Sequence, residues 1–374
     1  MRVSRITVAV LYGGRSPEHS ISCVSAGAVM SNLDPERYDV VPVGITTTGA
    51  WVVGTSDFSS LRISDRQLPQ VDDAAERVSM GTCETDRGVI RFAEGPRAGD
   101  VLTRADVVFP VLHGPNGEDG TIQGLLELSG VPYVGPGVFA SSAAMDKEFT
   151  KKVLGEAGLP IGTQIVLRGD EGAQAVSESD RERLGLPVFV KPARGGSSIG
   201  ITKVADWAGL ESAIATAREH DTKVIIEAGI IGREVECGVL QFPDGEIRAS
   251  LPAEIHFPDE PDTSGEGAES ADAAFYDFDT KYIDAVSSYD LPATLSAGET
   301  AEVQRMAVDA FRALDAKGLS RVDFFVTASG PVINEVNTIP GFTPISMYPK
   351  MWEASGVEYA ELLDTLLRTA LGNG

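Results

Sequence analysis

Residues 321–337 read RVDFFVTASGPVINEVN, and this stretch predicts a β-hairpin. Two runs rich in valine, isoleucine and phenylalanine flank a turn that contains Ser-Gly-Pro, which favours a reversal of the chain. Because side chains alternate along a strand, Arg321 and Asp323 share one face of the first strand. Glu335 and Asn337 share one face of the second strand for the same reason. If the pairing is symmetric about the turn, Asp323 lies opposite Glu335 and the arginine lies opposite the asparagine.

The polar face of this hairpin predicts a site for a hard cation. Two carboxylates directly opposite each other repel unless a positive group lies between them. Carboxylate and amide oxygens suit Mg²⁺, and phosphate oxygens would complete its coordination. The alternative is an ordinary hairpin whose polar side faces solvent. The position of Asn337 beside Asp323 and Glu335 favours the metal site.

A second stretch, VKPARGGSSIG at residues 190–200, predicts a loop that binds phosphate. Glycines let the backbone approach a polyanion closely, and Ser197 and Ser198 add hydrogen-bond donors. The loop is not a Walker A loop, because the pattern G-x-x-x-x-G-K-[ST] does not occur and Lys191 precedes the glycines. Together with Lys147, which begins a basic helix, the loop and the hairpin predict a nucleoside triphosphate site. The alternative is a polar turn between two strands.

Composition and charge limit the class of protein. The chain has 374 residues, of which 43% are apolar and 23% charged, as in globular proteins of two or three domains. Its net charge of −24 argues against nucleic acid as a partner, because contact with a phosphate backbone needs a basic surface. The acidity fits either a high-salt environment or solubility alone. Three dispersed cysteines and the lack of a long apolar stretch predict a reducing, cytoplasmic location without membrane contact.

The order of the predicted elements indicates an α/β fold with three domains. Residues 1–145 alternate helices with the strands ITVAVLY, DVVPVGI, ADVVFPVLH and VPYVG, which predicts a mainly parallel sheet. Residues 146–231 hold the basic helix, the glycine-serine loop and the strand KVIIEA, and residues 232–374 hold the strand REVECGVLQF and the hairpin. Residues 55–100 carry no recognisable motif. Residues 258–274 carry six acids and no base, which predicts an excursion from the compact fold.

Several stretches together resemble the D-alanine–D-alanine ligase family of ATP-grasp enzymes over nearly the whole chain. They are GGRSPEHSIS, HGPNGEDGTIQGLLEL, MDKEFTKK, VKPARGGSSIG, FYDFDTKY, and RVDFF followed by NEVNTIPGFTPIS. The resemblance implies a three-domain ATP-grasp architecture, α/β overall and α+β in the ATP-grasp part, with ATP between the second and third domains. It implies that the carboxylate of one D-alanine attacks the γ-phosphate of ATP to give an acyl phosphate. The amine of a second D-alanine then forms D-alanyl-D-alanine for peptidoglycan synthesis, and ADP and phosphate are released.

The resemblance also implies roles for individual residues. Glu18 is implied to hold the ammonium of the first D-alanine and to form a catalytic hydrogen-bonded set with Ser197 and Tyr282, and His113 is implied to lie beside it in the substrate site. Those implied to bind the carboxylate of the second D-alanine are Lys281 and Ser346, and those implied to stabilise the tetrahedral oxyanion are Arg321 and the N–H of Gly341. Those implied to contact the nucleotide are Lys147, Lys191, Ser197, Ser198, Glu227, Ala228, Ile230, Glu234, Lys281 and Asn334. Two Mg²⁺ ions, for which Mn²⁺ could substitute, would be held by Asp323, Glu335 and Asn337. A homodimer is expected by resemblance, and a requirement for a monovalent cation stays open.

Other interpretations of these residues stay open from the sequence. Glu18 could be a carboxylate facing a helix start, and His113 could be a hydrogen-bonding structural residue. Tyr282 favours an amine as the second nucleophile, whereas a D-alanyl-D-serine or D-alanyl-D-lactate ligase would be a related alternative. A catalytically silent nucleotide-binding protein should have lost a metal ligand or the oxyanion arginine, and both are present. The pattern GPGVFA at residues 135–140 resembles a dinucleotide fingerprint, but its proline and late position disfavour that function.

Overall fold

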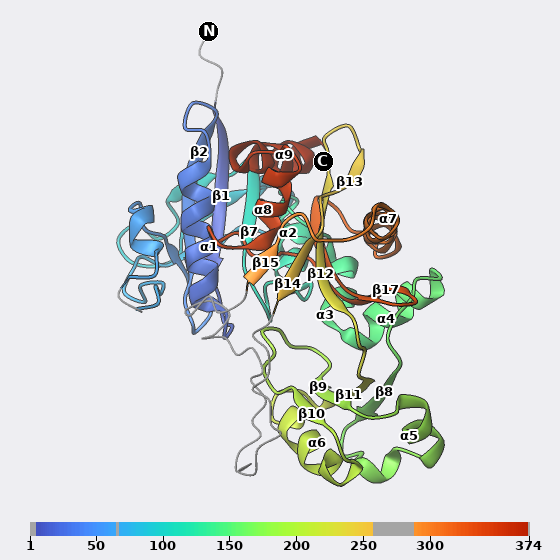
Figure 1. Ribbon diagram of the computed structural model, residues 1–374. Helices are drawn as coiled ribbons and strands as arrows, with labels where there is room; N and C mark the ends of the chain where they lie inside the picture. The colour runs from blue at the N-terminus through green and yellow to red at the C-terminus, as the bar shows by residue number, and fades with distance from the viewer. Residues whose placement is uncertain (1–4, 65–66, 257–287, 373–374) are drawn as a thin grey trace.

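The computed structural model describes residues 5–64, 67–256 and 288–372 (Figure 1). Lys281, Tyr282 and the acidic segment 258–274 therefore lie outside the described residues. Within the described ranges the chain forms three larger β-sheets and one small sheet, with helices packed against them. No helix in those ranges is long and apolar enough to cross a membrane.

The N-terminal sheet is mainly parallel, as the sequence predicts. Its strand order is β3-β2-β1-β7, in which β1 runs parallel to β2 and β7 while β3 is antiparallel to β2. Strand β1 is an almost unbroken apolar run buried on both faces, which is typical of a central parallel strand. The elements are β1 (Ile6–Gly13), α1 (His19–Asn32), β2 (Tyr38–Ile45), β3 (Trp51–Val53), β7 (Val107–Val111) and α2 (Thr121–Ser129).

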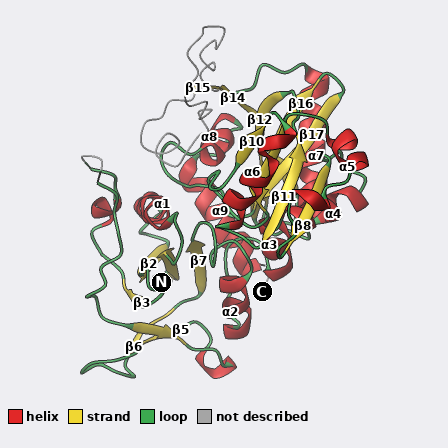
Figure 2. Ribbon diagram, turned by 90° about the horizontal axis from the view of Figure 1, so that it is seen from below, coloured by secondary structure: helices red, strands yellow, loops and turns green. Residues whose placement is uncertain are grey.

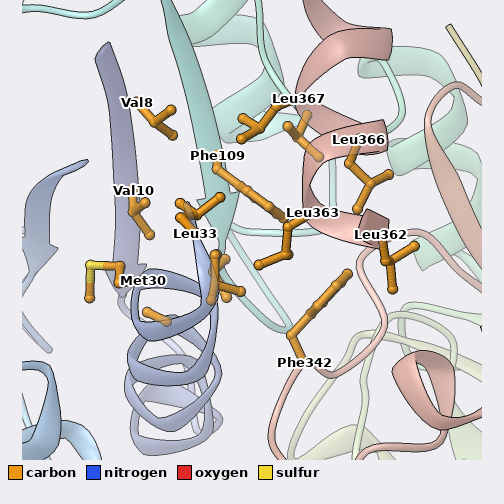
Figure 3. Close-up of a cluster of buried hydrophobic side chains, with 14 of the residues drawn as sticks. Val8, Val10, Met30, Leu33, Phe109, Phe342, Leu362, Leu363, Leu366 and Leu367 are labelled. Atoms are coloured by element: carbon orange, nitrogen blue, oxygen red, sulfur yellow. The ribbon is translucent and has the colours of Figure 1, made fainter. Parts of the chain in front are cut away.

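The C-terminal helix completes the core of this sheet (Figure 3). Helix α9 (Tyr359–Gly372) presents an apolar face toward β1, β7 and α1. Phe342, from the loop that follows the hairpin, meets Phe109 edge to face at 5.9 Å between ring centroids. The buried leucines of that face are Leu362, Leu363, Leu366 and Leu367. The first and last parts of the sequence therefore share one hydrophobic core, which fixes the loop after the hairpin beside the N-terminal sheet.

Residues 55–104 form a small antiparallel sheet and short turns on the outer side of the N-terminal sheet. Its elements are η1 (Phe58–Leu61), β4 (Val78–Met80), η2 (Glu84–Asp86), β5 (Val89–Phe92) and β6 (Val101–Arg104). The expected strand VPYVG is wrong, since only a single bridge joins Tyr133 to Val108. Pro132 lacks an N–H and Gly135 has φ +109°, so pairing stops after two hydrogen bonds to Val108.

The central sheet is antiparallel and has the order β10-β9-β11-β8. Helices α5 and α6 cover it, and α4 connects it to the N-terminal part. The glycine-serine loop joins β9 to the short strand β10, which the sequence analysis did not predict. The elements are α3 (Val138–Met145), α4 (Lys147–Glu156), β8 (Gln164–Arg168), η3 (Ala173–Ala175), α5 (Glu178–Leu184), β9 (Val188–Pro192), β10 (Thr202–Val204), η4 (Trp207–Gly209), α6 (Leu210–Arg218) and β11 (Lys223–Ala228).

The C-terminal sheet has the order β15-β14-β12-β16-β17, with β13 paired to β12. Along β16 buried side chains alternate with partly exposed ones: Val322, Phe324 and Val326 pack toward α7, and Arg321 and Asp323 face the other way. Figure 2 shows this sheet and the central sheet grouped together, apart from the N-terminal strands. The elements are β12 (Arg233–Gln241), β13 (Ile247–Ala249), β14 (Ala253–His256), β15 (Ser288–Asp290), α7 (Ala297–Ala313), β16 (Leu319–Thr327), β17 (Gly330–Asn337) and α8 (Met347–Ala354).

Candidate active site

A cavity of about 200 Å³ lies where the start of α1, the glycine-serine loop and the hairpin β16–β17 meet. Half of its lining residues carry polar or charged side chains, and the lining residues come from distant parts of the sequence. The predicted site residues that line it are Glu18, His113, Lys147, Lys191, Ser197, Ser198, Arg321, Asn334, Glu335, Asn337 and Gly341. The fold thus brings together side chains that the sequence analysis assigned to substrate, phosphate and metal.

Glu18 precedes α1 and its carboxylate points away from the helix. It is the N-cap residue of α1, but it makes no side-chain hydrogen bond to the helix start among the described residues. Instead Ser197 Oγ donates to Glu18 Oε1 at 2.5 Å, across 179 residues of sequence. A Cβ atom added at Gly114, where φ is +72°, would come within 2.5 Å of Glu18 Oε2. Glycine is therefore required there to leave room for the carboxylate.

His113 is a buried neutral ring held by two hydrogen bonds. Its Nδ1 lies 3.2 Å from the carbonyl oxygen of Ile339 and its Nε2 lies 3.0 Å from Ser25 Oγ. Because a carbonyl only accepts, Nδ1 carries the proton and Nε2 accepts from the serine. Burial lowers the pKa of His113, which keeps the ring neutral. These contacts fit the structural interpretation of His113 and also fix the loop that contains Ile339.

Glu118 lines the same cavity, and the sequence analysis gave it no role. Its carboxylate accepts hydrogen bonds from Gly114 N at 2.6 Å and from Ile339 N at 3.3 Å. Burial and the nearby Glu18 raise the pKa of Glu118 to about 8. The signal was available in the sequence, because Glu118 lies within the HGPNGEDG stretch that directly follows a strand.

The glycine-serine loop adopts an unusual backbone conformation. Ser197 and Ser198 have φ values of +51° and +57°, where residues with side chains are uncommon and cost about 1–3 kcal/mol each. Lys147 Nζ donates to the carbonyl oxygen of Gly195 at 2.8 Å and lies 4.0 Å from Glu335 Oε2. Burial lowers the pKa of Lys147 although Glu335 opposes this effect. A buried ammonium beside a strained loop is a plausible receptor for an anion.

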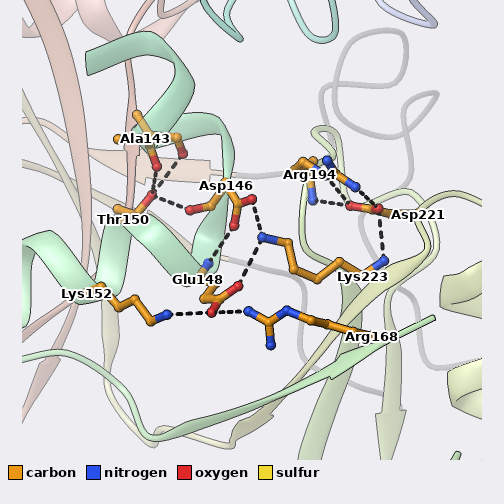
Figure 4. A network of polar contacts seen from close by, with 10 residues as sticks. Ala143, Asp146, Glu148, Thr150, Lys152, Arg168, Arg194, Asp221 and Lys223 are labelled. Carbon is orange, nitrogen blue, oxygen red and sulfur yellow. Dashed lines mark hydrogen bonds and ion pairs between the residues drawn. The ribbon is translucent and has the colours of Figure 1, made fainter. Parts of the chain in front are cut away.

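Helix α4 is fixed to the central sheet by a network of ion pairs (Figure 4). Lys223 Nζ contacts Asp146 and Glu148, the latter at 3.0 Å. Asp146 also caps the helix by accepting a hydrogen bond from Glu148 N at 3.2 Å. The network therefore sets the position of the helix that carries Lys147.

A buried triad of charges lies at the end of β11. Glu227 contacts Lys191 through one carboxylate oxygen and Lys151 through the other. Burial would raise the pKa of Glu227, but the two ammonium groups lower it to about 2. Lys151 was missed by the sequence analysis, because its partner is 76 residues away. The predicted Ala228, Ile230 and Glu234 follow along the joint into β12, and the side chain of Glu234 is exposed.

The hairpin pairs as predicted, with Asp323 opposite Glu335 and Arg321 opposite Asn337. A bulge between Asp323 and Phe324 produces this register, and it places Asn334 in the cavity lining together with Glu335. Arg321 donates from Nε and one terminal nitrogen to the two carboxylate oxygens of Asp323, each at 2.7 Å. Asn337 donates to the same carboxylate at 2.9 Å, which leaves its amide oxygen as an acceptor.

The charges at the hairpin fit a divalent cation. Glu236 on β12 is opposite Asp323, and its buried Oε2 has no hydrogen-bond partner among the described residues while lying 3.4 Å from Arg321 Nε. Burial raises the pKa of Asp323 to about 7 although Arg321 opposes the shift, and Glu236 adds to it. One arginine therefore faces three carboxylates, counting Glu335. This excess of acid with an amide oxygen nearby is a ligand set that suits Mg²⁺.

Gly341 and Ser346 lie close together after the hairpin. A Cβ atom added at Gly341 would come within 2.6 Å of Ser346 Oγ. Ser346 precedes α8, and its hydroxyl accepts from Thr343 N at 3.1 Å. Gly341 lines the cavity, whereas Ser346, Asp323 and the residues of the β11 joint are not among its lining residues.

The chain is similar to known proteins along nearly its whole length. Residues 7–136 match the family described as "D-ala D-ala ligase N-terminus" and residues 153–368 match "D-ala D-ala ligase C-terminus". The chain is 61% identical over 374 residues to a D-alanine–D-alanine ligase of Rhodococcus erythropolis, which covers 100% of this chain and 99% of that protein. It is 60% identical over 371 residues to the same-named enzyme of Nocardia farcinica, covering 99% and 98%.

Solved structures agree in fold with the present one. The VanG D-Ala:D-Ser ligase from Enterococcus faecalis superposes with a TM-score of 0.80 at 34% identity, covering 98% of this chain and 100% of that chain. A D-alanine–D-alanine ligase from Coxiella burnetii superposes with a TM-score of 0.80 at 32% identity, covering 99% and 95%. The predicted fold class, α/β with a mainly parallel N-terminal sheet and an α+β ATP-grasp part, is thereby confirmed, and the further sheets are antiparallel.

Proposed function

The chain belongs to the D-alanine–D-alanine ligase family, and from this membership we propose how its residues carry out the reaction. The enzyme joins two D-alanines in an ATP-dependent reaction, and its product is a precursor of peptidoglycan. The observation that supports our assignment of the site best is the contact between Glu18 and Ser197. This contact joins the Glu18 carboxylate, which is predicted to bind substrate, to the predicted phosphate loop in a single cavity.

We propose that the nucleotide lies between the central and C-terminal sheets. Lys147 and Lys191 would neutralise its phosphates, and the strained loop would close over them. The base would lie at the end of β11, where Glu227 is buried. The remaining proposed contacts are Ser197, Ser198, Ala228, Ile230, Glu234, Lys281 and Asn334.

The metal site is proposed at the hairpin. Asp323, Glu335 and Asn337 would hold two Mg²⁺ ions, or Mn²⁺ in their place, and the bound ions would neutralise phosphate charge. The buried Oε2 of Glu236, which has no hydrogen bond among the described residues although Arg321 lies 3.4 Å away, supports a cation at this place. A monovalent cation requirement is not assigned to any residue.

For the substrates we propose that Glu18 accepts the ammonium group of the first D-alanine, in a hydrogen-bonded set with Ser197 and Tyr282. His113 would support the same subsite from the side. Arg321 and the N–H of Gly341 would stabilise the oxyanion, because donors fixed in a dry cavity are most effective on a developing charge. The carboxylate of the second D-alanine would meet Ser346 and Lys281.

The domain organisation, the oligomeric state and the cellular location of the enzyme can be proposed as well. We propose domains at residues 1–145, 146–231 and 232–374, each built around one of the larger sheets. A homodimer is proposed from the family resemblance. A cytoplasmic location is proposed because the reaction consumes ATP and the cysteines are not paired.

The test is phosphate release from ATP in the presence of Mg²⁺ with different acceptors. Release with D-alanine alone, matched by formation of the dipeptide and absent with L-alanine, is expected. Release at limiting D-alanine only after D-lactate is added would overturn the proposed role of Tyr282 in favouring an amine over a hydroxyl as the second nucleophile. Release only after D-serine is added would leave that role standing and change the second substrate to D-serine. Release that is unaffected by Glu18→Gln would overturn the assignment of the first subsite.

A further inference from the structure

Lys151 is a buried cation for which the reaction so far gives no role. It lies on α4 one turn after Lys147, so the two lysines are on the same side of the helix. The side chain of Lys151 is only 4% exposed. Its ammonium contacts Glu227 Oε1 and lies 3.4 Å from the carbonyl oxygen of Gly162. Burial of a lysine is unfavourable, so a compensating function is expected.

The two lysines that contact Glu227 differ in what surrounds them. Lys191 lines the active-site cavity, whereas Lys151 lies behind it among residues of α4 and the loop before β8. Each takes a different oxygen of the carboxylate: Lys151 takes Oε1 and Lys191 takes Oε2. A nucleotide phosphate would attract Lys191, and Oε2 would then need another donor. Lys151 does not line the cavity in which the phosphates are proposed to lie, so it would stay on Oε1.

The charge of Glu227 depends on these partners. A buried carboxylate is strongly disfavoured without a cation, and burial alone raises the pKa of Glu227. An ionised carboxylate only accepts hydrogen bonds, whereas a protonated one also donates. The cation that remains on Glu227 therefore decides whether the nucleotide base meets an acceptor or a donor.

We propose that Lys151 is a positioning residue that determines which purine base the enzyme accepts. It holds Glu227 ionised, with Oε2 available to the exocyclic amine of adenine. A purine with a carbonyl group at that position, as in inosine triphosphate, meets a carboxylate that cannot donate and is rejected. This inference rests on the proposed contact between Glu227 and the base.

The experiment compares kcat/KM for ATP with kcat/KM for inosine triphosphate in Lys151→Met, Glu227→Gln and the double variant. Loss of a charged hydrogen-bond partner in Lys151→Met is expected to lower kcat/KM for ATP by about 10- to 100-fold. The value for inosine triphosphate should change much less, so the ratio of the two falls, while KM for D-alanine is unchanged. The matched control is Lys152→Met, which removes the same charge from the adjacent residue, whose side chain is 60% exposed.

Glu227→Gln is expected to lower the preference for ATP over inosine triphosphate, because the glutamine amide can donate a hydrogen bond to the carbonyl group of the inosine base. Adding Lys151→Met to this variant should change the ratio by no more than about twofold, because no carboxylate remains to be held. If Lys151→Met alone fails to fold, the comparison of Glu227→Gln with the double variant decides. The double variant removes the buried ion pair between Lys151 and Glu227 as a whole. If the double variant prefers ATP over inosine triphosphate much less than Glu227→Gln does, the inference is overturned.

The outcomes separate this inference from the function on which it rests. A changed ratio in Glu227→Gln with an unchanged ratio in Lys151→Met would leave the base contact standing and refute the role of Lys151. An unchanged ratio in both variants would refute the base contact as well. A fall in the ratio with Lys151→Met and not with Lys152→Met supports the inference, since a purely structural role would lower activity with both nucleotides equally.

Discussion

Replacing Glu148 by glutamine tests how α4, the helix that carries the proposed nucleotide contact Lys147, is held in place. The side chain of Glu148 is 3% exposed and lies at the centre of the network in Figure 4. Its partners are Lys152 at 2.7 Å, Lys223 at 3.0 Å and Arg168 at 2.5 Å. Glutamine keeps the size of the side chain and removes the charge, so three cations would then surround a neutral amide.

The expected loss of stability follows from the pKa of Glu148. Burial raises this pKa, but hydrogen bonds from Lys152, Lys223 and Arg168 lower it from 4.5 to about 2. At about 1.4 kcal/mol per pKa unit, the upper limit is about 3.4 kcal/mol of stabilisation. Lys152 and Arg168 are 60% and 58% exposed, so solvent screens them and we expect about 2 kcal/mol. A lowered carboxyl pKa stabilises the folded state above pH 4.5, and this contribution falls as the pH approaches 2.

The assay is the thermal unfolding midpoint of Glu148→Gln and of the parent protein between pH 7 and pH 3. At pH 7 the variant should melt about 2–3 °C lower, because an unfolding entropy of about 2.1 cal/mol/K per residue over 374 residues gives about 1.3 °C per kcal/mol. At pH 3 the difference should fall to less than about half, because the carboxylate of the unfolded chain is then protonated. Lys152→Met is the control, and its effect should stay below about 1 kcal/mol because that lysine is mostly exposed. A difference that is constant from pH 7 to pH 3 would refute the charge argument.

Three further variants test the site itself. Asp323→Asn should abolish Mg²⁺-dependent turnover while the protein stays folded, because it removes a carboxylate of the proposed metal site; retained turnover would contradict the metal site. Ser197→Ala removes the donor to Glu18 and should raise KM for D-alanine by about 10-fold or more while KM for ATP changes little, as steady-state kinetics would show. Gly341→Ala would bring a methyl group within 2.6 Å of Ser346 Oγ and should lower kcat at least about 10-fold with binding of ATP preserved; an unchanged kcat would remove Gly341 from the oxyanion site.

The hairpin could be predicted from sequence because its information is local. Alternation of side chains and a turn rich in small residues are sufficient to pair Asp323 with Glu335. The bulge was not predictable in the same way. The turn pairs Thr327 with Gly330, and an uninterrupted ladder from there would place Asp323 opposite Asn334. The bulge shifts the pairing by one residue. This shift restores the predicted pairing of Asp323 with Glu335 and brings Asn334 to the cavity.

Residues whose role depends on distant partners could not be identified from the sequence. Lys151 appears as one of several lysines on a helix, and only the fold places it against Glu227. Glu236 looks like a polar position on a strand, and only the pairing of β12 with β16 places it opposite Asp323. The prediction of a strand at VPYVG was wrong for a local reason. Its apolar pattern is correct, but Pro132 and the following glycine limit the hydrogen bonds that the backbone can make.

The distribution of charge explains why one cavity would need both a nucleotide and a metal. On one side burial lowers the pKa of Lys147, so this ammonium is stabilised by any anion that approaches it. On the other side burial raises the pKa of Asp323, and Glu236 leaves a buried oxygen without a hydrogen bond in the described structure. The two sides neutralise each other only in part: Lys147 Nζ lies 4.0 Å from Glu335 Oε2 but also donates to the carbonyl oxygen of Gly195, and Lys191 is paired with Glu227. A triphosphate carrying Mg²⁺ presents an anion to the first side and a cation to the second, and so relieves both at once.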